Sequence, residues 1–386
     1  MSPSVVIVGA GVMGASVAYH LATRGWRDVL VLDRSHRAGQ GSTGAATGGF
    51  RAQYPTAINV RLSLLAREKL LRFEEETGID PEYRPAGYLW LATGPAELDG
   101  LRAALTVQQQ EGLHEATEVG VDDVRRINPA VHPEEVVGGV FCPSDGFIAP
   151  LQILKGYHTA AVRKGVQVEW QTTVTGMVRD SRGNIIAVET SRGRILTSAV
   201  VNAAGPWAAG LADQAGVSLP VIPLRRQVAA TVPCTLLPPD MPMTIFAGDG
   251  FHFRVRDGRV LLLWPTPGVP GQPFDVTVDG EWIAQVRAMA SRRVPLLRDV
   301  AIDVAGSWAG LYEMSPDKHA ILGRAPGCEN LYLINGSSGH GVMHAPALGA
   351  LLAELMSDGK FSALDATALR PSRFADGPAH PVSGAL

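Results

Sequence analysis

The fold is decided by residues 5–34, which read VVIVGAGVMGASVAYHLATRGWRDVLVLDR. Four apolar residues run directly into a turn that contains Gly9, Gly11 and Gly14. A helical pattern follows as far as Gly25, and a second apolar run ends on Asp33. This order predicts a strand, a tight turn, a helix and a parallel strand with an acidic residue at its tip.

Each glycine of the turn has its own physical role. Gly9 permits the sharp turn, Gly11 lets the backbone approach a pyrophosphate, and Gly14 lets the helix pack closely on the sheet. The free amides and the positive dipole end of the helix attract phosphate groups, and Asp33 can accept hydrogen bonds from an adenosine ribose. The stretch therefore predicts an adenine dinucleotide site and leaves NAD and FAD both open.

Length and composition narrow the class of protein. A chain of 386 residues predicts about two domains, and 46% hydrophobic with 18% charged residues is typical of a folded globular protein. The net charge of −3 is no reason to expect nucleic acid. Basic residues occur in pairs, at 125–126, 225–226 and 292–293, which we expect on the solvated surface.

Cysteine usage and apolar runs indicate the compartment. The three cysteines lie far apart and form no CxxC motif, so we expect a reducing environment without disulfides or structural zinc. The first apolar run is interrupted by glycines, which favours a strand over a signal peptide. No apolar stretch reaches the roughly 18 residues that span a bilayer. These features predict a cytoplasmic protein with no transmembrane segment.

A second glycine-rich segment, GQGSTGAATGG at residues 39–49, follows the second strand. An NAD-binding domain would normally continue here with a third strand, whereas small hydroxyl groups and exposed amides suit a bulky polar ligand. A flexible linker is the alternative, but it fits poorly between a strand end and a strongly patterned helix. The segment favours FAD, with contacts expected from Gly41, Ser42, Thr43, Thr47, Gly48 and Gly49.

Alternating elements then predict a Rossmann-type α/β domain interrupted by a mainly antiparallel one. Helices are expected over residues 56–77, 95–112, 121–129, 151–163, 280–293 and 342–356. Strands are expected over 88–91, 166–170, 174–178, 185–189, 195–201, 221–232, 251–256, 260–264, 300–308 and 331–334, with a hairpin turn at Asp257-Gly258. The loop 264–274 is expected to form a rim or lid.

We assign residues 1–50, 138–216 and 318–370 to an FAD-binding domain. Residues 51–137 and 217–317 are assigned to a substrate domain, and 371–386 to a loose C-terminal tail. Two further turns, NAAGPW at 202–207 and NGSSGHG at 335–341, have small residues where a ligand could approach. Together with the first turn they predict further cofactor contacts from Ala10, Val12, Met13, Ala204, Gly205, Trp207, Gly339, His340, Gly341, Val342 and Met343. We also assign Arg34, Val174 and Gly310 to the cofactor site.

The segments GAGVMG, GSTGAATGGFRAQY, NAAGPWA, GLYEMSPDKHAILG and NGSSGHGVMHAPALG together resemble the FAD-dependent amino-acid oxidase family. That family includes glycine oxidase, D-amino-acid oxidase and sarcosine oxidase, and the similarity is greatest to sarcosine oxidase, its heteromeric β-subunit and L-proline dehydrogenases. The resemblance implies oxidation of an amino acid at its C–N bond by hydride transfer to flavin N5. Water would then hydrolyse the imine.

The sequence also departs from that family. Gly310 stands where monomeric sarcosine oxidase has a cysteine that holds FAD covalently, and no histidine occupies residues 150–152, where the β-subunit carries a covalent FMN. We therefore expect non-covalent FAD. Met343 replaces a carboxylate-binding lysine, and the lysine linked to oxygen activation has no counterpart around residues 251–254. The electron acceptor, O2 or another redox carrier, stays open. The expected substrate is a secondary or N-substituted amino acid, for which sarcosine, proline, hydroxyproline or an opine would fit. The alternative is an FAD-carrying subunit of a heteromeric amino-acid or opine dehydrogenase with little activity alone.

Five residues are candidates for the substrate end of the site. Arg51 follows the flavin loop directly and matches the family's carboxylate-binding arginine. His252 and Arg254 share one strand face, which is either functional or solvated. Tyr54 and Tyr312, next to Glu313, could close the pocket. His340 and His344 are four residues apart, as in a zinc-binding helix, but the glutamate of that motif is missing, so no metal is expected.

Overall fold

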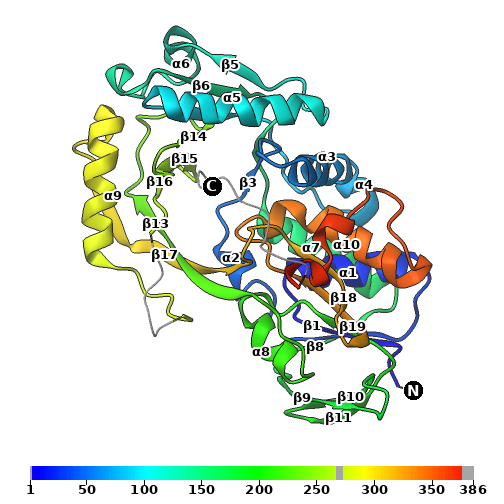
Figure 1. The fold of residues 1–386 in the computed structure, drawn as a ribbon. Coiled ribbons are helices and arrows are strands. Elements are labelled where there is room, and N and C mark those ends of the chain that lie inside the picture. Colours follow the sequence, from blue (N-terminus) through cyan, green and yellow to red (C-terminus); the bar gives the residue numbers. More distant parts are fainter. Residues whose placement is uncertain (1, 267–272, 376–386) are drawn as a thin grey trace.

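The computed structural model describes residues 2–266 and 273–375 and arranges them around two large sheets (Figure 1). The stretch that opens the chain forms β1 (Val5–Val8), α1 (Val12–Thr23) and β2 (Val29–Leu32). β1 and β2 are parallel, with Val5 beside Val29. The strand, helix and parallel strand that residues 5–34 predict are therefore confirmed.

The first large sheet has six strands in the order β18-β19-β12-β1-β2-β8. All neighbouring pairs are parallel except β18 and β19. Its strands come from distant parts of the chain, so the dinucleotide fold is assembled from separate segments. The remaining four strands are β8 (Gln167–Glu169), β12 (Val200–Asn202), β18 (Ile321–Ala325) and β19 (Cys328–Asn335).

Helices cover one face of this sheet, where α1 packs against α7 (Pro150–Arg163) and α10 (Gly341–Asp358). The Ser16 hydroxyl of α1 donates to the Ala345 carbonyl of α10 at 2.8 Å. Alternate residues of β1 and β2 face a second core, as expected for a sheet buried on both sides. That core is closed by α8 (Ala208–Asp213) and by a small antiparallel sheet of β9 (Val174–Arg179), β10 (Ile185–Thr190) and β11 (Gly193–Leu196).

The second large sheet has eight strands in the order β17-β13-β16-β15-β14-β4-β6-β5, and only β4 and β14 pair in parallel. The mainly antiparallel character and the hairpin at Asp257-Gly258 are confirmed. Its strands are β4 (Tyr88–Ala92), β5 (Thr117–Val119), β6 (Gly138–Cys142), β13 (Ile222–Thr231), β14 (Met243–Phe246), β15 (His252–Arg256), β16 (Arg259–Leu263) and β17 (Ile302–Met314).

Helices also support the antiparallel sheet (Figure 1). α9 (Gly280–Arg293) buries Trp282 and Val286 in one core with Phe251 and Phe253 of the sheet. α5 (Pro95–Gln110) lies on β4 and β6, and α6 (Val121–Ile127) contacts β5 and β6. Between the two large sheets run the short elements α2 (Ser42–Ala45), β3 (Gly49–Phe50) and β7 (Gly146–Phe147).

Some elements differ from those expected. The helix expected over 56–77 is divided at Arg72 into α3 (Ala57–Leu71) and α4 (Phe73–Thr77). The strand expected over 195–201 is two strands, β11 and β12, in different sheets. Residues 138–142, assigned to the FAD-binding domain, pair instead with β4 in the antiparallel sheet. Periodicity alone could not detect these changes, because a local apolar pattern does not specify the partner strand.

The C-terminal segment also differs from the expected loose tail. Residues Pro371–Phe374 form a short 3-10 helix whose Arg373 is buried, while 376–386 lie outside the described residues. In the described part of the chain, no helix is long and apolar enough to cross a membrane.

Candidate active site

A cavity of about 840 Å³ lies between the two large sheets and receives side chains and backbone from both. It extends from the first glycine turn, past the loop 39–49, to strands β13, β15 and β17 and the start of α10. Of the predicted cofactor contacts, only Gly14 does not line it. The lining includes Gly9, Ala10, Gly11, Val12, Met13, Asp33, Arg34, Gly41, Ser42, Thr43, Thr47, Gly48, Gly49, Val174, Ala204, Gly205, Trp207, Gly310, Gly339, His340, Gly341, Val342 and Met343.

The glycines of the first turn have the geometry that the sequence predicts. A Cβ atom at Gly14 would lie 1.9 Å from the Gly9 carbonyl oxygen, so α1 can approach the turn only without a side chain there. Gly9 has a φ of +109°, and a Cβ would lie 2.3 Å from the Ala203 oxygen. A Cβ at Gly11 would meet only the Thr43 hydroxyl, at 3.5 Å, and would otherwise point into the cavity.

We therefore predict that Gly11→Ala will lower FAD affinity about tenfold, or about 1.4 kcal/mol, because the methyl group occupies space needed by the pyrophosphate. The apoprotein should keep its thermal midpoint, since the added Cβ meets no backbone. FAD titration followed by fluorescence quenching measures the affinity. Gly100→Ala is a matched control, because its Cβ would meet nothing within 4 Å on exposed α5. Equal FAD affinity in the two variants would contradict the role of Gly11.

Hydrogen bonds join the two glycine-rich segments at the nucleotide end. The Val12 amide donates to Thr43 Oγ1 at 3.2 Å. Asp33 accepts from the amides of Ala10 and Ser35, each at 2.7 Å, so its carboxylate is fixed beside the turn. These contacts hold the amides of the glycine turn, the Thr43 hydroxyl and the Asp33 carboxylate in fixed positions.

Aromatic stacking closes the rim of the nucleotide end. The Arg34 guanidinium lies 3.8 Å from the centre of the Trp207 ring, and Phe274 stacks on the same ring at 5.6 Å with an interplanar angle of 8°. The rim or lid expected over 264–274 stays a prediction, because residues 267–272 lie outside the described residues.

Side chains of the antiparallel sheet donate hydrogen bonds to backbone carbonyl groups of the loop 39–49. Trp308 Nε1 donates to Ala45 and Arg254 Nη1 donates to Thr47, both at 2.8 Å. Arg254 also lies 3.5 Å from the centre of the Phe147 ring, and burial lowers its pKa to about 10. Arg254 does not line the cavity and supports the loop through Thr47, and its catalytic role stays a prediction. The solvated-face alternative is wrong, because Arg254 is buried and His252 is largely buried.

Arg51 is the central cation at the other end of the cavity and is only 6% exposed. Its guanidinium lies 4.3 Å from the centre of the Tyr54 ring and 5.1 Å from that of Trp90. Nη2 lies 3.2 Å from His340 Nε2. Because arginine only donates, Nε2 must accept, which makes His340 neutral with its proton on Nδ1. Burial and the charge of Arg51 both lower the pKa of His340 accordingly.

Tyr54 supports Arg51 from behind the cavity, which it does not line. Its hydroxyl donates to Met343 Sδ at 3.2 Å, its ring stacks edge-on to His340, and burial raises its pKa to about 12. Tyr54 is therefore a positioning residue in this geometry, whereas His252 and Tyr312 face the cavity directly. A Cβ at Gly339 would lie 2.3 Å from the Tyr312 ring, so the backbone before α10 packs flat against that ring.

Two further cations, Arg226 and Lys318, line the same end of the cavity and were missed in the sequence. The expectation that the pair 225–226 is solvated surface is wrong for both residues, which are largely buried. The expectation for 292–293 is wrong for Arg293, which is buried and pairs with Asp249 at 2.9 Å. A basic pair in a strand places its members on opposite faces. This alternation is the sequence signal that could have predicted that only one of the two arginines, Arg226, faces the cavity.

Several buried polar atoms along the lining have no partner among the described residues. They are Ser42 Oγ in the loop 39–49 and, near the start of α10, Glu313 Oε2 and Ser337 Oγ. Buried polar groups are normally hydrogen-bonded, so these atoms suit a ligand that brings both donors and acceptors. A flavin ring, with its N–H and carbonyl groups, meets that requirement, and a phosphate suits Ser42.

The profile of the family described as "DAO: FAD dependent oxidoreductase" matches residues 4–355. The chain belongs to this family. Glycine oxidase from Geobacillus kaustophilus is 29% identical, with 91% of this chain and 92% of that protein covered. Rat mitochondrial dimethylglycine dehydrogenase is also 29% identical over 96% of this chain, which spans only 44% of that longer protein. The crystal structure of L-proline dehydrogenase from P. horikoshii superposes with a TM-score of 0.90 at 27% identity, covering 98% and 99% of the two chains.

The cofactor of this FAD-dependent oxidoreductase is therefore FAD, and the residues present fit it. When bound, FAD supplies a two-electron acceptor. The first glycine turn and Asp33 would hold its AMP half, and the loop 39–49 and the start of α10 would hold the flavin half. The amides at the start of α10 would stabilise negative charge there.

We predict that this FAD is non-covalent. A Cβ at Gly310 would lie 2.8 Å from Ala45 Cβ, so β17 packs against the flavin loop without a side chain at this position. Acid precipitation of the holoprotein should leave the yellow colour in the supernatant, as absorbance of the two fractions will show. A yellow pellet would contradict the prediction.

Proposed function

We propose that the protein oxidises the C–N bond of a secondary or N-substituted amino acid. A hydride would leave the carbon next to nitrogen for flavin N5. A secondary amine would also lose the proton on nitrogen and give an imine, whereas a tertiary amine would give an iminium ion. Water would then hydrolyse the C=N bond. Family membership supports an FAD-dependent enzyme acting on CH–NH donors. The names of the relatives, for glycine, dimethylglycine and L-proline, agree on an amino-acid substrate. Dimethylglycine and L-proline are N-substituted or secondary amines, whereas glycine is a primary amine.

The observation that carries the proposal is Arg51. It is a buried cation that lines the cavity, and none of the ion pairs found among the described residues includes it. A desolvated guanidinium without a counter-ion is costly unless a ligand provides one. Its planar donors suit a carboxylate in the bidentate geometry. Contacts with Tyr54, Trp90 and His340 hold the Arg51 guanidinium in place at this end of the cavity.

The surrounding groups favour an uncharged amine. Burial lowers the pKa of His252 to about 4 and that of His344 to about 3, so both imidazoles are neutral at neutral pH. The charge of Arg51, which acts on both histidines, also disfavours a second cation such as an ammonium group. Burial also raises the pKa of Tyr312. The apolar side chains Met243, Ile245 and Leu263 complete this end of the lining and restrict water. A carboxylate held by Arg51 would leave the neutral amine in this dry region, where hydride transfer needs little acid–base assistance.

The test is an anaerobic titration of the purified holoprotein with glycine, sarcosine, N,N-dimethylglycine, L-proline and D-proline. At least one secondary or N-substituted compound should bleach the visible flavin band. Admission of air then separates an oxidase, which recovers its colour rapidly, from a dehydrogenase that needs another acceptor. If none of a broad amino-acid panel bleaches the flavin, the isolated chain is not such an enzyme, and the role of an FAD-carrying subunit takes its place.

A further inference from the structure

Arg226 gives the cavity a second guanidinium, separate from Arg51. It lies in β13, directly opposite Gly310 of β17, and its side chain reaches the same end of the cavity. Nη1 donates to the carbonyls of Arg225, at 3.3 Å, and Thr266, at 2.6 Å. Among the described residues no carboxylate pairs with Arg226, whereas its neighbour Arg225 pairs with Asp275 at 2.7 Å. Burial lowers the pKa of Arg226, which marks the cost of keeping this charge dry.

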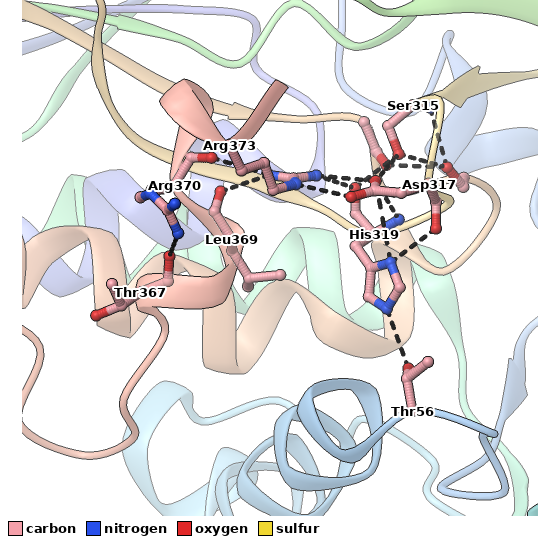
Figure 2. Close-up of polar contacts among 10 residues, drawn as sticks. Thr56, Ser315, Asp317, His319, Thr367, Leu369, Arg370 and Arg373 are labelled. Atoms are coloured by element: carbon pink, nitrogen blue, oxygen red, sulfur yellow. Dashed lines mark hydrogen bonds and ion pairs between the residues drawn. The ribbon is translucent and has the colours of Figure 1, made fainter. Parts of the chain in front are cut away.

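Lys318 adds positive charge close to Arg226. It lines the cavity from the loop between β17 and β18, and burial together with the charge of Arg226 lowers its pKa. The loop is fixed by the contacts of Asp317 with Arg373 and of His319 with Thr56, which Figure 2 shows. Lys318 has a φ of +59°, a conformation that a non-glycine residue keeps only when its surroundings fix it.

The carboxylates of the cavity do not balance the charges of Arg51 and Arg226. Its carboxylates in the described part of the chain are Asp33, Asp249 and Glu313. Asp33 is bound by backbone amides at the nucleotide end, and Asp249 pairs with Arg293. Burial raises the pKa of Glu313 to about 7, so it is a weak counter-charge at neutral pH. Arg51 and Arg226 therefore both lack an ion-pair partner among these carboxylates. Asp145, whose pKa burial raises to about 6 against the opposing effect of the Arg51 charge, does not line the cavity and accepts hydrogen bonds from Ala52 and Gln53.

Both guanidinium groups face one small region. The Arg226 guanidinium carbon lies 5.7 Å from the centre of the Tyr312 ring, and Tyr312 and His252 line the cavity beside it. The charges of Arg51 and Arg226 each act on the pKa of Tyr312 and on that of His252, after the larger effect of burial. One ligand of amino-acid size can therefore reach both cations.

We propose that the substrate carries two carboxylates on opposite sides of its amine nitrogen, as in an N-(carboxyalkyl) amino acid. One carboxylate would bind Arg51 and the other Arg226, with Lys318 supplying further positive charge. This inference rests on the proposed function and specifies its substrate. Oxidation would remove a hydride from one carbon next to nitrogen and a proton from nitrogen. Water would then cleave the C=N bond to give a 2-oxo acid and a primary amino acid.

The test compares substrates that differ only in the second carboxylate. Anaerobic titration of the holoprotein with sarcosine and iminodiacetate, and with N-ethylalanine and N-(1-carboxyethyl)alanine, gives the concentration that half-reduces the flavin. At least one dicarboxylate should reduce the flavin at a concentration at least tenfold lower than its matched partner. Arg226→Met should remove this advantage, because it should weaken reduction by the dicarboxylate at least tenfold more than reduction by the monocarboxylate. Arg225→Met, on the other strand face, should keep the advantage.

A second readout needs no turnover. Glutarate or malonate should raise the thermal midpoint of the holoprotein more than acetate does at equal ionic strength, and Arg226→Met should abolish the difference. Equal reduction by both members of each pair, or an equal loss for both in Arg226→Met, would overturn the inference and leave the proposed function standing. Failure of every compound to reduce the flavin would overturn the proposed function, and this inference with it.

Discussion

Replacing Arg51 by methionine is expected to weaken substrate binding about 10- to 150-fold, equivalent to about 1.5–3 kcal/mol for a lost charge-assisted hydrogen-bond pair. Methionine keeps much of the side-chain volume between Tyr54 and Trp90, so these two rings should stay packed. Arg51→Lys should recover only part of the loss, since an ammonium group cannot make the planar two-point contact. The measurement is the half-saturating concentration for anaerobic flavin reduction by whichever amino acid the panel identifies.

The control for Arg51 is Arg84→Met, which removes an exposed arginine paired with Glu82 at 3.0 Å. It should leave saturation unchanged, as exposed ion pairs contribute little. FAD content should be the same in both variants, because Arg51 lies at the substrate end. Unchanged saturation in Arg51→Met would remove this residue from the site.

Replacing Arg373 by methionine is expected to lower the free energy of unfolding by about 3–5 kcal/mol, the cost of leaving a buried charge without its partner. Arg373 Nε and Nη2 donate to the two carboxylate oxygens of Asp317 at 2.7 and 3.0 Å (Figure 2). Arg373 is 7% exposed and Asp317 is 1% exposed. Denaturant unfolding of the wild-type and Arg373→Met holoproteins measures the difference in the free energy of unfolding. Arg324→Met, which breaks an exposed pair with Glu329, should cost far less.

The same pair predicts a dependence on pH. Burial alone would raise the pKa of Asp317, but the hydrogen bonds and charge of Arg373 outweigh it, and the net pKa is lowered. A lowered pKa in the folded state contributes stability that is complete above the ordinary value for aspartate, about 4, and is lost as the pH falls through the lower folded value. In Arg373→Met the isolated carboxyl can escape its penalty by taking up a proton. The stability gap between wild type and variant should therefore narrow from pH 7 to pH 4, and a constant gap would contradict an electrostatic origin.

Loss of Arg373 should also disturb the substrate end. The bidentate contact between Arg373 and Asp317 fixes the loop that carries Lys318. Arg373, near the C-terminal end of the described chain, thereby supports a residue that lines the cavity. Nothing in the local sequence around 371–375 indicates this role, because a short polar segment near a terminus usually has few contacts. Only the tertiary structure brings Arg373 to Asp317, across 56 residues of chain.

The dinucleotide site was predictable because its signals are local. A strand, a glycine turn and a helix N-terminus are specified within residues 5–34, where steric limits on φ and the period of apolar residues act over a few positions. The flavin loop and the turn before α10 are equally short segments, and nearly every cofactor residue inferred from them lines the cavity. Met343, inferred in the same way, also receives the Tyr54 hydroxyl.

The substrate end depended on the tertiary structure. Whether Arg51, Arg226 and Arg254 are exposed, paired or directed into a cavity depends on β13, β15, β17 and α10, which are far apart in the sequence. The sequence by itself therefore determined the family, the cofactor and the backbone that binds it. The tertiary structure alone decided which cations are desolvated and lack a counter-charge, because desolvation and charge pairing depend on neighbours in space and not in sequence.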